Sequence, residues 1–102
     1  MSNIYSIDEI REKLRPIFEA EPIYKAVLFG SYATGRATEK SDVDIAIETE
    51  PHVRGLMFYG ILGKLIDVLG VKVDMIPMRS IKPNSHIEKE INETGRMIYE
   101  RR

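Results

Sequence analysis

Apolar residues recur at helical spacing near the start of the chain. Ser6 and Glu9 precede most of this run with the spacing of a capping box, which predicts a helix that begins after Ser6. Pro16 should end or kink this helix near its last turn. The apolar positions at helical spacing are Ile7, Ile10, Leu14 and Ile17, with Phe18 alongside.

A longer amphipathic helix is predicted over residues 53–69, and it contains two glycines in its interior. Gly60 and Gly63 each cost about 1 kcal/mol relative to alanine in a helix. We expect both glycines to allow close packing against a neighbouring element. A groove that receives a partner protein is the alternative interpretation.

Between and after these helices the apolar pattern changes to that of strands. Strands are predicted over residues 24–29, 42–48 and 71–76, with a short helix after Ser85 and a last short strand over residues 97–99. This alternation of helices and strands predicts one α/β domain that spans residues 1–102.

The second predicted strand has two chemically different faces. Residues two apart on a strand point to the same side. One face therefore carries Val43, Ile45 and Ile47, and the other carries Asp42, Asp44 and Ala46. In the third strand, Asp74 likewise lies on the face opposite Val71, Val73 and Met75.

Composition excludes several classes of protein. The chain of 102 residues has no cysteine, so disulfides and thiolate metal sites are excluded and a reducing, cytoplasmic location is expected. Its formal net charge is −1, whereas dedicated nucleic-acid-binding surfaces carry a clear basic excess, so no direct nucleic-acid binding is expected. We expect neither a signal peptide nor a membrane span.

The pair Asp42 and Asp44 is the first candidate for chemistry. Two carboxylates on the same side of a strand repel each other, and burial raises that cost. A strand usually keeps such a pair because a cation lies between the two side chains. Ligands that are oxygen atoms alone favour Mg²⁺ or Mn²⁺ over Zn²⁺.

Gly30 and Ser31 are the second candidate, because they follow an apolar strand directly and open a predicted short helix. Glycine lets the backbone approach a ligand closely, and the first amides of a helix offer unpaired donors to an anion. The Ser31 hydroxyl adds another donor. The sequence therefore predicts a phosphate-binding turn close to the carboxylate pair.

Asp74 is the third candidate. If its strand neighbours the strand of Asp42 and Asp44, three carboxylates converge, which is enough for two metal ions about 3.5–4 Å apart. Each feature alone is weak, because paired acids and Gly-Ser turns are common on protein surfaces. Their combination at fixed spacing on three strands favours binding of a metal and a triphosphate.

At these residues the chain resembles a known family. Gly30-Ser31, ten residues and then Asp42-Val43-Asp44 match the signature of the DNA polymerase β-like nucleotidyltransferase superfamily, and the short length resembles its MNT group, the minimal nucleotidyltransferases. The resemblance implies a mixed sheet with helices packed on one face. It also implies Asp42, Asp44 and Asp74 as catalytic metal ligands, and Gly30 and Ser31 at the triphosphate.

One position departs from the family pattern. Many members have arginine at the position of Thr34, whereas here Arg36 follows the glycine, and either Arg36 or Lys40 is left to supply the positive charge. Asp74 is the best candidate to accept the proton of the acceptor hydroxyl or to bind the metal ion that activates it. His86 is expected to be a surface or capping residue, and for Tyr32 and Tyr59 packing is expected in preference to base stacking.

The resemblance further implies a partner. MNT proteins are commonly encoded beside a HEPN-domain RNase toxin and act as its antitoxin, and family members transfer AMP from ATP to a tyrosine of that toxin. Two alternatives stay open: an antitoxin that neutralises its partner by binding alone, and a transferase for a small acceptor such as an aminoglycoside. The intact carboxylates count against the first, and the lack of a second, acceptor-binding domain counts against the second.

Overall fold

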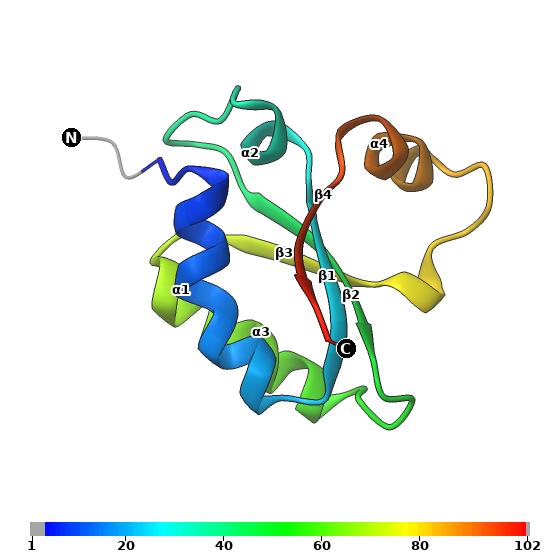
Figure 1. Ribbon diagram of the computed structural model, residues 1–102. Coiled ribbons are helices and arrows are strands. Elements are labelled where there is room, and N and C mark those ends of the chain that lie inside the picture. Colours follow the sequence, from blue (N-terminus) through cyan, green and yellow to red (C-terminus); the bar gives the residue numbers. More distant parts are fainter. Residues whose placement is uncertain (1–3, 102) are drawn as a thin grey trace.

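The computed structural model describes residues 4–101 and contains a four-stranded sheet in the order β3-β2-β1-β4 (Figure 1). The sheet is mixed, because β1 pairs antiparallel with β2 and β4 while β2 pairs parallel with β3. The strands are β1 (Ile23–Phe29), β2 (Val43–Thr49), β3 (Val73–Pro77) and β4 (Arg96–Glu100). The expected last strand is thus confirmed, and it forms one edge of the sheet.

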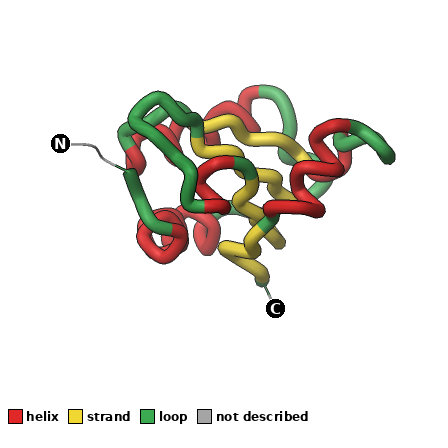
Figure 2. The backbone as a smooth tube through the Cα atoms, turned by 90° about the horizontal axis from the view of Figure 1, so that it is seen from above, coloured by secondary structure: helices red, strands yellow, loops and turns green. Residues whose placement is uncertain are grey.

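Four helices and one 3-10 turn surround the sheet (Figures 1 and 2). They are α1 (Ile7–Ala20), α2 (Ser31–Thr34), α3 (Leu56–Leu69), α4 (His86–Thr94) and the turn η1 (Met78–Ser80). The two long helices α1 and α3 pack on one face, and Figure 1 shows the short α4 on the other side of the sheet. The predicted α/β class and mixed sheet are confirmed, whereas the expectation that the helices pack on one face is wrong for α4.

The main core lies between the sheet and the two long helices. Alternation directs one face of each strand toward these helices, and the buried side chains there are mostly branched and aliphatic. Fully buried members include Ile10, Leu14 and Phe18 of α1, Leu28 of β1, Ile45 of β2, and Ile61 and Leu65 of α3. The core face therefore leaves the opposite face of β1 and β2 free for other side chains.

That opposite face carries a second, smaller buried layer. Phe29 and Ala46 are buried, although both lie outside the main core cluster. Ile91 of α4 shares a cavity with Ala46, so α4 covers this side of β2. The carboxylates predicted for the site lie on this same face.

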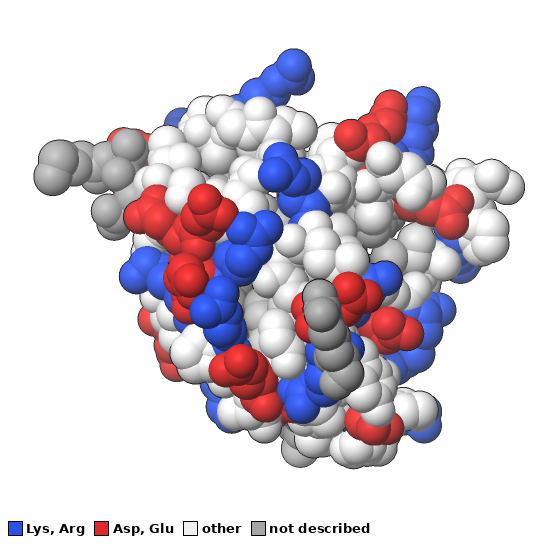
Figure 3. Space-filling view, viewed as in Figure 1, with Lys and Arg blue, Asp and Glu red and all other residues white. Residues whose placement is uncertain are grey.

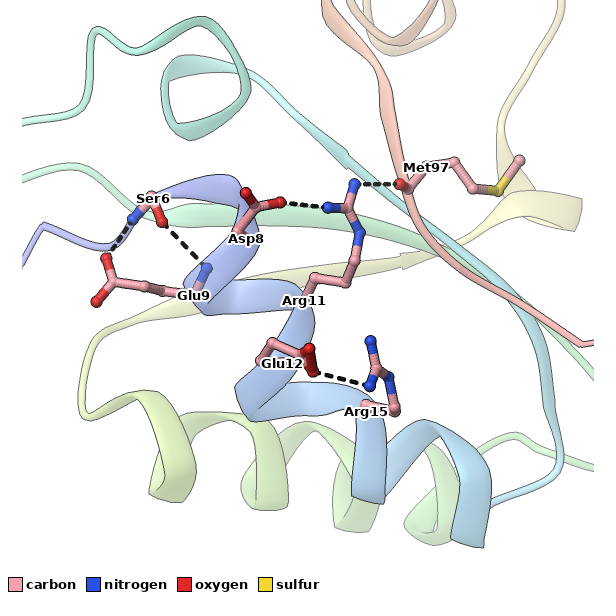
Figure 4. A network of polar contacts seen from close by, with 7 residues as sticks. All are labelled: Ser6, Asp8, Glu9, Arg11, Glu12, Arg15 and Met97. Atoms are coloured by element: carbon pink, nitrogen blue, oxygen red, sulfur yellow. Dashed lines mark hydrogen bonds and ion pairs between the residues drawn. The ribbon is translucent and has the colours of Figure 1, made fainter.

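Helix α1 begins as predicted. Figure 4 shows the reciprocal capping box, in which Ser6 Oγ accepts from the Glu9 amide and Glu9 Oε1 accepts from the Ser6 amide. Of the two effects expected of Pro16, an end or a kink near the last turn, the first is wrong, because the helix continues to Ala20, and the second stays a prediction. Pro16 removes one backbone donor, but burial of Phe18 beyond it keeps the last turn docked.

Helix α3 differs from the prediction in its start and in its glycines. It begins after Gly55, whose φ of 60° is unfavourable for other residues. The expected close packing at Gly60 and Gly63 is wrong, because a Cβ atom at either position would meet nothing within 4 Å. Tyr59, expected to be packed, is 65% exposed. The outer side of α3 is therefore open to solvent. This helix lies on the face of the sheet opposite the carboxylates.

The surface matches the balanced charge of the chain. Along α1 acidic and basic side chains lie side by side (Figure 3), paired as Arg11 with Asp8 and Arg15 with Glu12. Within residues 4–101, no helix is long and apolar enough to cross a membrane. Residues 1–3, part of the segment for which no signal peptide is expected, lie outside the described residues.

Candidate active site

The turn at Gly30 is held in a conformation that only glycine adopts readily. Its φ of 77° and ψ of −152° redirect the chain from β1 into α2, and its carbonyl accepts from the amides of Ala33 and Thr34. A Cβ atom at Gly30 would stand 2.6 Å from Asp44 Oδ2. The backbone of the turn therefore lies directly against a predicted metal ligand, as the sequence motif requires.

The amide of Gly30 is not free for a phosphate. It donates to Thr94 Oγ1 at 2.9 Å, and the same hydroxyl donates to the Glu90 carbonyl at 2.8 Å. The donors left for the predicted phosphate-binding turn are thus the amides at the start of α2 and the Ser31 hydroxyl. Thr94 fixes the orientation of the peptide that presents them.

The carboxylates come from the adjacent strands β2 and β3. Asp44 and Asp74 are direct register partners in the parallel pair, so their side chains leave the sheet on the same side. The condition set for Asp74, that its strand should neighbour that of Asp44, is therefore met. Asp42 precedes β2 by one residue, and its Oδ2 lies 3.6 Å from Lys72 Nζ.

The electrostatics of this cluster are unfavourable for a negative charge on Asp44. The pKa of the Asp44 carboxyl is raised from 3.8 to about 6, mainly by burial, and the charges of Asp74, Glu90 and Asp42 account for the rest of this increase. Asp74 is exposed, and Asp42 and Asp44 are half-buried. A cation at this place would relieve the repulsion that the fold maintains.

The donor set fits a hard divalent cation such as Mg²⁺. Within residues 4–101, no three His, Asp or Glu side chains are grouped closely enough to hold an ion by themselves. Mg²⁺ usually binds through one or two carboxylates together with substrate phosphates. Phosphate oxygens held at Ser31 would complete such a shell beside Asp44, so cation and triphosphate are expected to bind together.

The remaining candidates are exposed at the surface or already packed. His86 is exposed at the first position of α4, and Arg36 and Lys40 are exposed in the loop after α2. Tyr32 is buried, as expected for a packing residue, and burial raises its pKa. Tyr59 lies on α3, on the opposite side of the sheet.

Sequence reasoning missed two residues of α4. Glu90 contributes a negative charge to the surroundings of Asp44, and Thr94 holds the Gly30 amide. Their spacing of four residues places both on the same face of the helix, which is a signal readable from sequence. What the sequence did not show is that this face turns toward the Gly30 turn.

Comparisons with known proteins agree with this geometry. A family model described as a nucleotidyltransferase domain matches residues 7–96. The Methanocaldococcus jannaschii protein MJ0128 is 38% identical over 100 residues, which cover 97% of this chain and 99% of the relative. The name of this relative gives it, provisionally, the activity of a protein adenylyltransferase.

Solved structures share the fold at lower identity. A toxin–antitoxin structure with AMP-PNP superposes with a TM-score of 0.75 at 21% identity, covering 90% of this chain and 74% of that one. A tri-AMPylated Shewanella oneidensis HEPN toxin in complex with an MNT antitoxin gives a TM-score of 0.70 at 18% identity, covering 93% and 73%. The turn at Gly30, the paired strands of Asp44 and Asp74 and the matched domain model agree, and the chain belongs to the nucleotidyltransferase domain family.

Proposed function

We propose that this nucleotidyltransferase transfers AMP from Mg²⁺-bound ATP to a tyrosine of a HEPN-domain toxin and thereby acts as its antitoxin. The observation that carries the proposal is the contact between the Gly30 turn and Asp44, with Asp74 paired beside it. This arrangement supports binding of a triphosphate at the turn and of a metal ion at the neighbouring carboxylates. The similarity to MJ0128 and to the AMPylated complex supports AMP as the transferred group.

Each proposed site residue has a distinct role. The Ser31 hydroxyl and the first amides of α2 bind the β- and γ-phosphates, while Gly30 leaves room for Asp44 beside them. Asp42, Asp44 and Asp74 would supply carboxylate ligands to one or two Mg²⁺ ions only together with phosphate oxygens of ATP, since within residues 4–101 no three such side chains are grouped closely enough to hold an ion by themselves. Bound Mg²⁺ would neutralise charge on the phosphates and on the leaving pyrophosphate.

The reaction is an in-line displacement at the α-phosphorus. The phenolic oxygen of the acceptor forms a bond to this phosphorus, and the bond from phosphorus to the oxygen that bridges to the β-phosphate breaks. Pyrophosphate leaves with that electron pair. Asp74 is exposed beside the site and accepts the phenolic proton.

The proposed acceptor hydroxyl belongs to the partner toxin. Among the described residues, α4 and η1 line the carboxylate face beside Ala46, whereas α1 and α3 occupy the other face. A partner that brings its own hydroxyl to this face converts the transfer into a reaction of docked groups, which proximity accelerates. The open side of α3 could still hold a partner, but it cannot present a hydroxyl directly to Asp44 across the sheet.

Labelled ATP distinguishes transfer from binding alone. The chain is incubated with Mg²⁺, the HEPN protein encoded beside its gene, and ATP labelled at either the α- or the γ-phosphate. We expect the α-label on the toxin and the γ-label in pyrophosphate, and neither with Asp42→Asn. A toxin that is inhibited but never labelled would establish the binding-only antitoxin. Label on an aminoglycoside and none on the toxin would establish the small-molecule transferase.

A further inference from the structure

A small apolar cavity lies on the same face of the sheet as the carboxylates. It has a volume of about 210 Å³ and opens to the surface beneath α4. Its lining residues are Ala46, Met78, Ile81, Glu88 and Ile91. Four of these five side chains are apolar, and Glu88 is the only carboxylate among them.

The strand register fixes where this cavity lies relative to the site. Ala46 follows Asp44 by two residues on β2 and therefore points to the same side, about 7 Å further along the strand. Phe29, the residue before the Gly30 turn, pairs with Asp44 on the neighbouring strand. The order along this face is therefore the Gly30 turn, then Asp44 and Asp74, then the cavity.

This order matches the geometry of displacement at phosphorus. The attacking and leaving oxygens lie on opposite sides of the phosphorus, roughly in line. If pyrophosphate leaves toward Ser31 and the phosphorus lies at Asp44, the attacking oxygen comes from the side of Ala46. The cavity is thus on the side of the acceptor.

The size and lining of the cavity suit one aromatic side chain. Pockets for drug-sized ligands, a class that includes nucleosides, usually span about 300–1,000 Å³, so this cavity is too small for a nucleoside. A tyrosine has an apolar ring and a polar tip, and it buries the ring while the hydroxyl stays with polar groups. The apolar walls of the cavity suit the ring, and the neighbouring carboxylates suit the hydroxyl.

We propose, resting on the function proposed above, that this cavity binds the ring of the acceptor tyrosine of a protein partner and directs its hydroxyl toward Asp44 and Asp74. Charge complementarity identifies the surroundings of that tyrosine. Glu88 lies at the cavity and Glu90 acts on Asp44 from the same helix, so the acceptor tyrosine is flanked by basic residues.

The first test measures binding independently of transfer. Three blocked tripeptides are compared, with tyrosine, phenylalanine or serine between two arginines, in the presence of Mg²⁺ and a non-transferable ATP analogue. We expect the tyrosine and phenylalanine peptides, but not the serine peptide, to shift the methyl NMR signals of Ala46, Ile81 and Ile91. Ile66, on the outer part of α3, should not respond. Shifts of the cavity methyls by the ATP analogue alone would assign the cavity to the base and overturn the proposal.

The second test fills the cavity and measures transfer of AMP to the tyrosine peptide. Ala46→Leu and, at the half-exposed rim, Ile81→Trp should each raise the KM for the peptide about tenfold or more, because the larger side chain occupies the space of the tyrosine ring. The affinity for ATP should change less than twofold. Ala20→Leu, at the exposed end of α1, is the matched control and should leave both values unchanged. Replacing the flanking arginines by glutamates should also raise the KM.

The outcomes separate this proposal from the proposed function. Peptide binding at the cavity without transfer of AMP would retain the cavity and refute the transferase. Transfer that neither variant impairs, without shifts at the cavity methyls, would refute the cavity and retain the transferase. If Ala46→Leu fails to fold, Ile81→Trp and the NMR measurement still show whether the cavity binds the tyrosine ring.

Discussion

Replacing Asp44 by asparagine should stabilise the metal-free protein. Asparagine keeps the shape of the side chain but cannot carry the charge that burial, Asp74, Glu90 and Asp42 disfavour. Because the pKa of Asp44 is raised in the folded state, the carboxyl favours folding at low pH. This contribution is lost as pH rises through the folded pKa of about 6.

The size of this effect follows from the raised pKa. An increase from 3.8 to about 6 corresponds to roughly 3 kcal/mol if all of it counts at pH 7. Asp44 is only half-buried, so solvent screening reduces this to about 1–1.5 kcal/mol. We therefore expect Asp44→Asn to unfold with a free energy about 1–1.5 kcal/mol higher than wild type at pH 7.5.

Urea denaturation in EDTA, repeated from pH 4 to pH 8, measures the difference directly. The stability advantage of Asp44→Asn should be smallest near pH 4 and reach its full value above pH 7. The exposed Asp67 on α3 provides the control, because Asp67→Asn should stay within about 0.5 kcal/mol of wild type. An Asp44→Asn protein that is less stable than wild type at pH 7.5, or a difference that does not vary with pH, would refute the reasoning.

Three further predictions concern ligands and the Gly30 turn. Mg²⁺ with ATP should raise the melting temperature of wild type more than either alone, and should not raise that of Asp44→Asn; an equal rise in both proteins would contradict the site. Ser31→Ala should weaken ATP binding by about 1–3 kcal/mol in calorimetry, and Gly30→Ala should abolish ATP binding. Gly35→Ala is the control and should leave ATP binding intact, because Gly35 has the same φ of 77° but lies in open space. Thr94→Val leaves the Gly30 amide without its acceptor and should lower the free energy of unfolding by about 1–3 kcal/mol, with Thr94→Ser restoring most of it; equal stability of the two variants would show that the bond to Gly30 contributes nothing.

The helices and strands were largely predictable because their signals are local. The capping box of Ser6 and Glu9 and the alternation around Asp44 each depend on a few neighbouring residues, and the structure contains both. Pro16 and Gly60 misled the prediction for a common reason: their consequences depend on tertiary packing. Burial of Phe18 keeps α1 intact beyond Pro16, and nothing packs against Gly60.

The sequence identified most residues of the candidate site, but it predicted their arrangement in space only in part. The motif placed Gly30 and Asp44 in one site, and the strand pairing that brings Asp74 beside Asp44 was stated as a condition. Thr94 and Glu90 were missed because they come from α4, whose orientation across the sheet depends on long-range packing. The cavity at Ala46 likewise forms only where β2, η1 and α4 meet.

Intact-mass spectrometry of the HEPN partner tests the central claim most directly. The partner is incubated with this chain, ATP and Mg²⁺, and then digested to locate any modification. We predict that its mass increases by one or more AMP groups on tyrosine, that its RNase activity falls in parallel, and that both changes are absent with Asp42→Asn or Asp44→Asn. A partner whose mass never changes while its RNase activity is still inhibited would contradict the account.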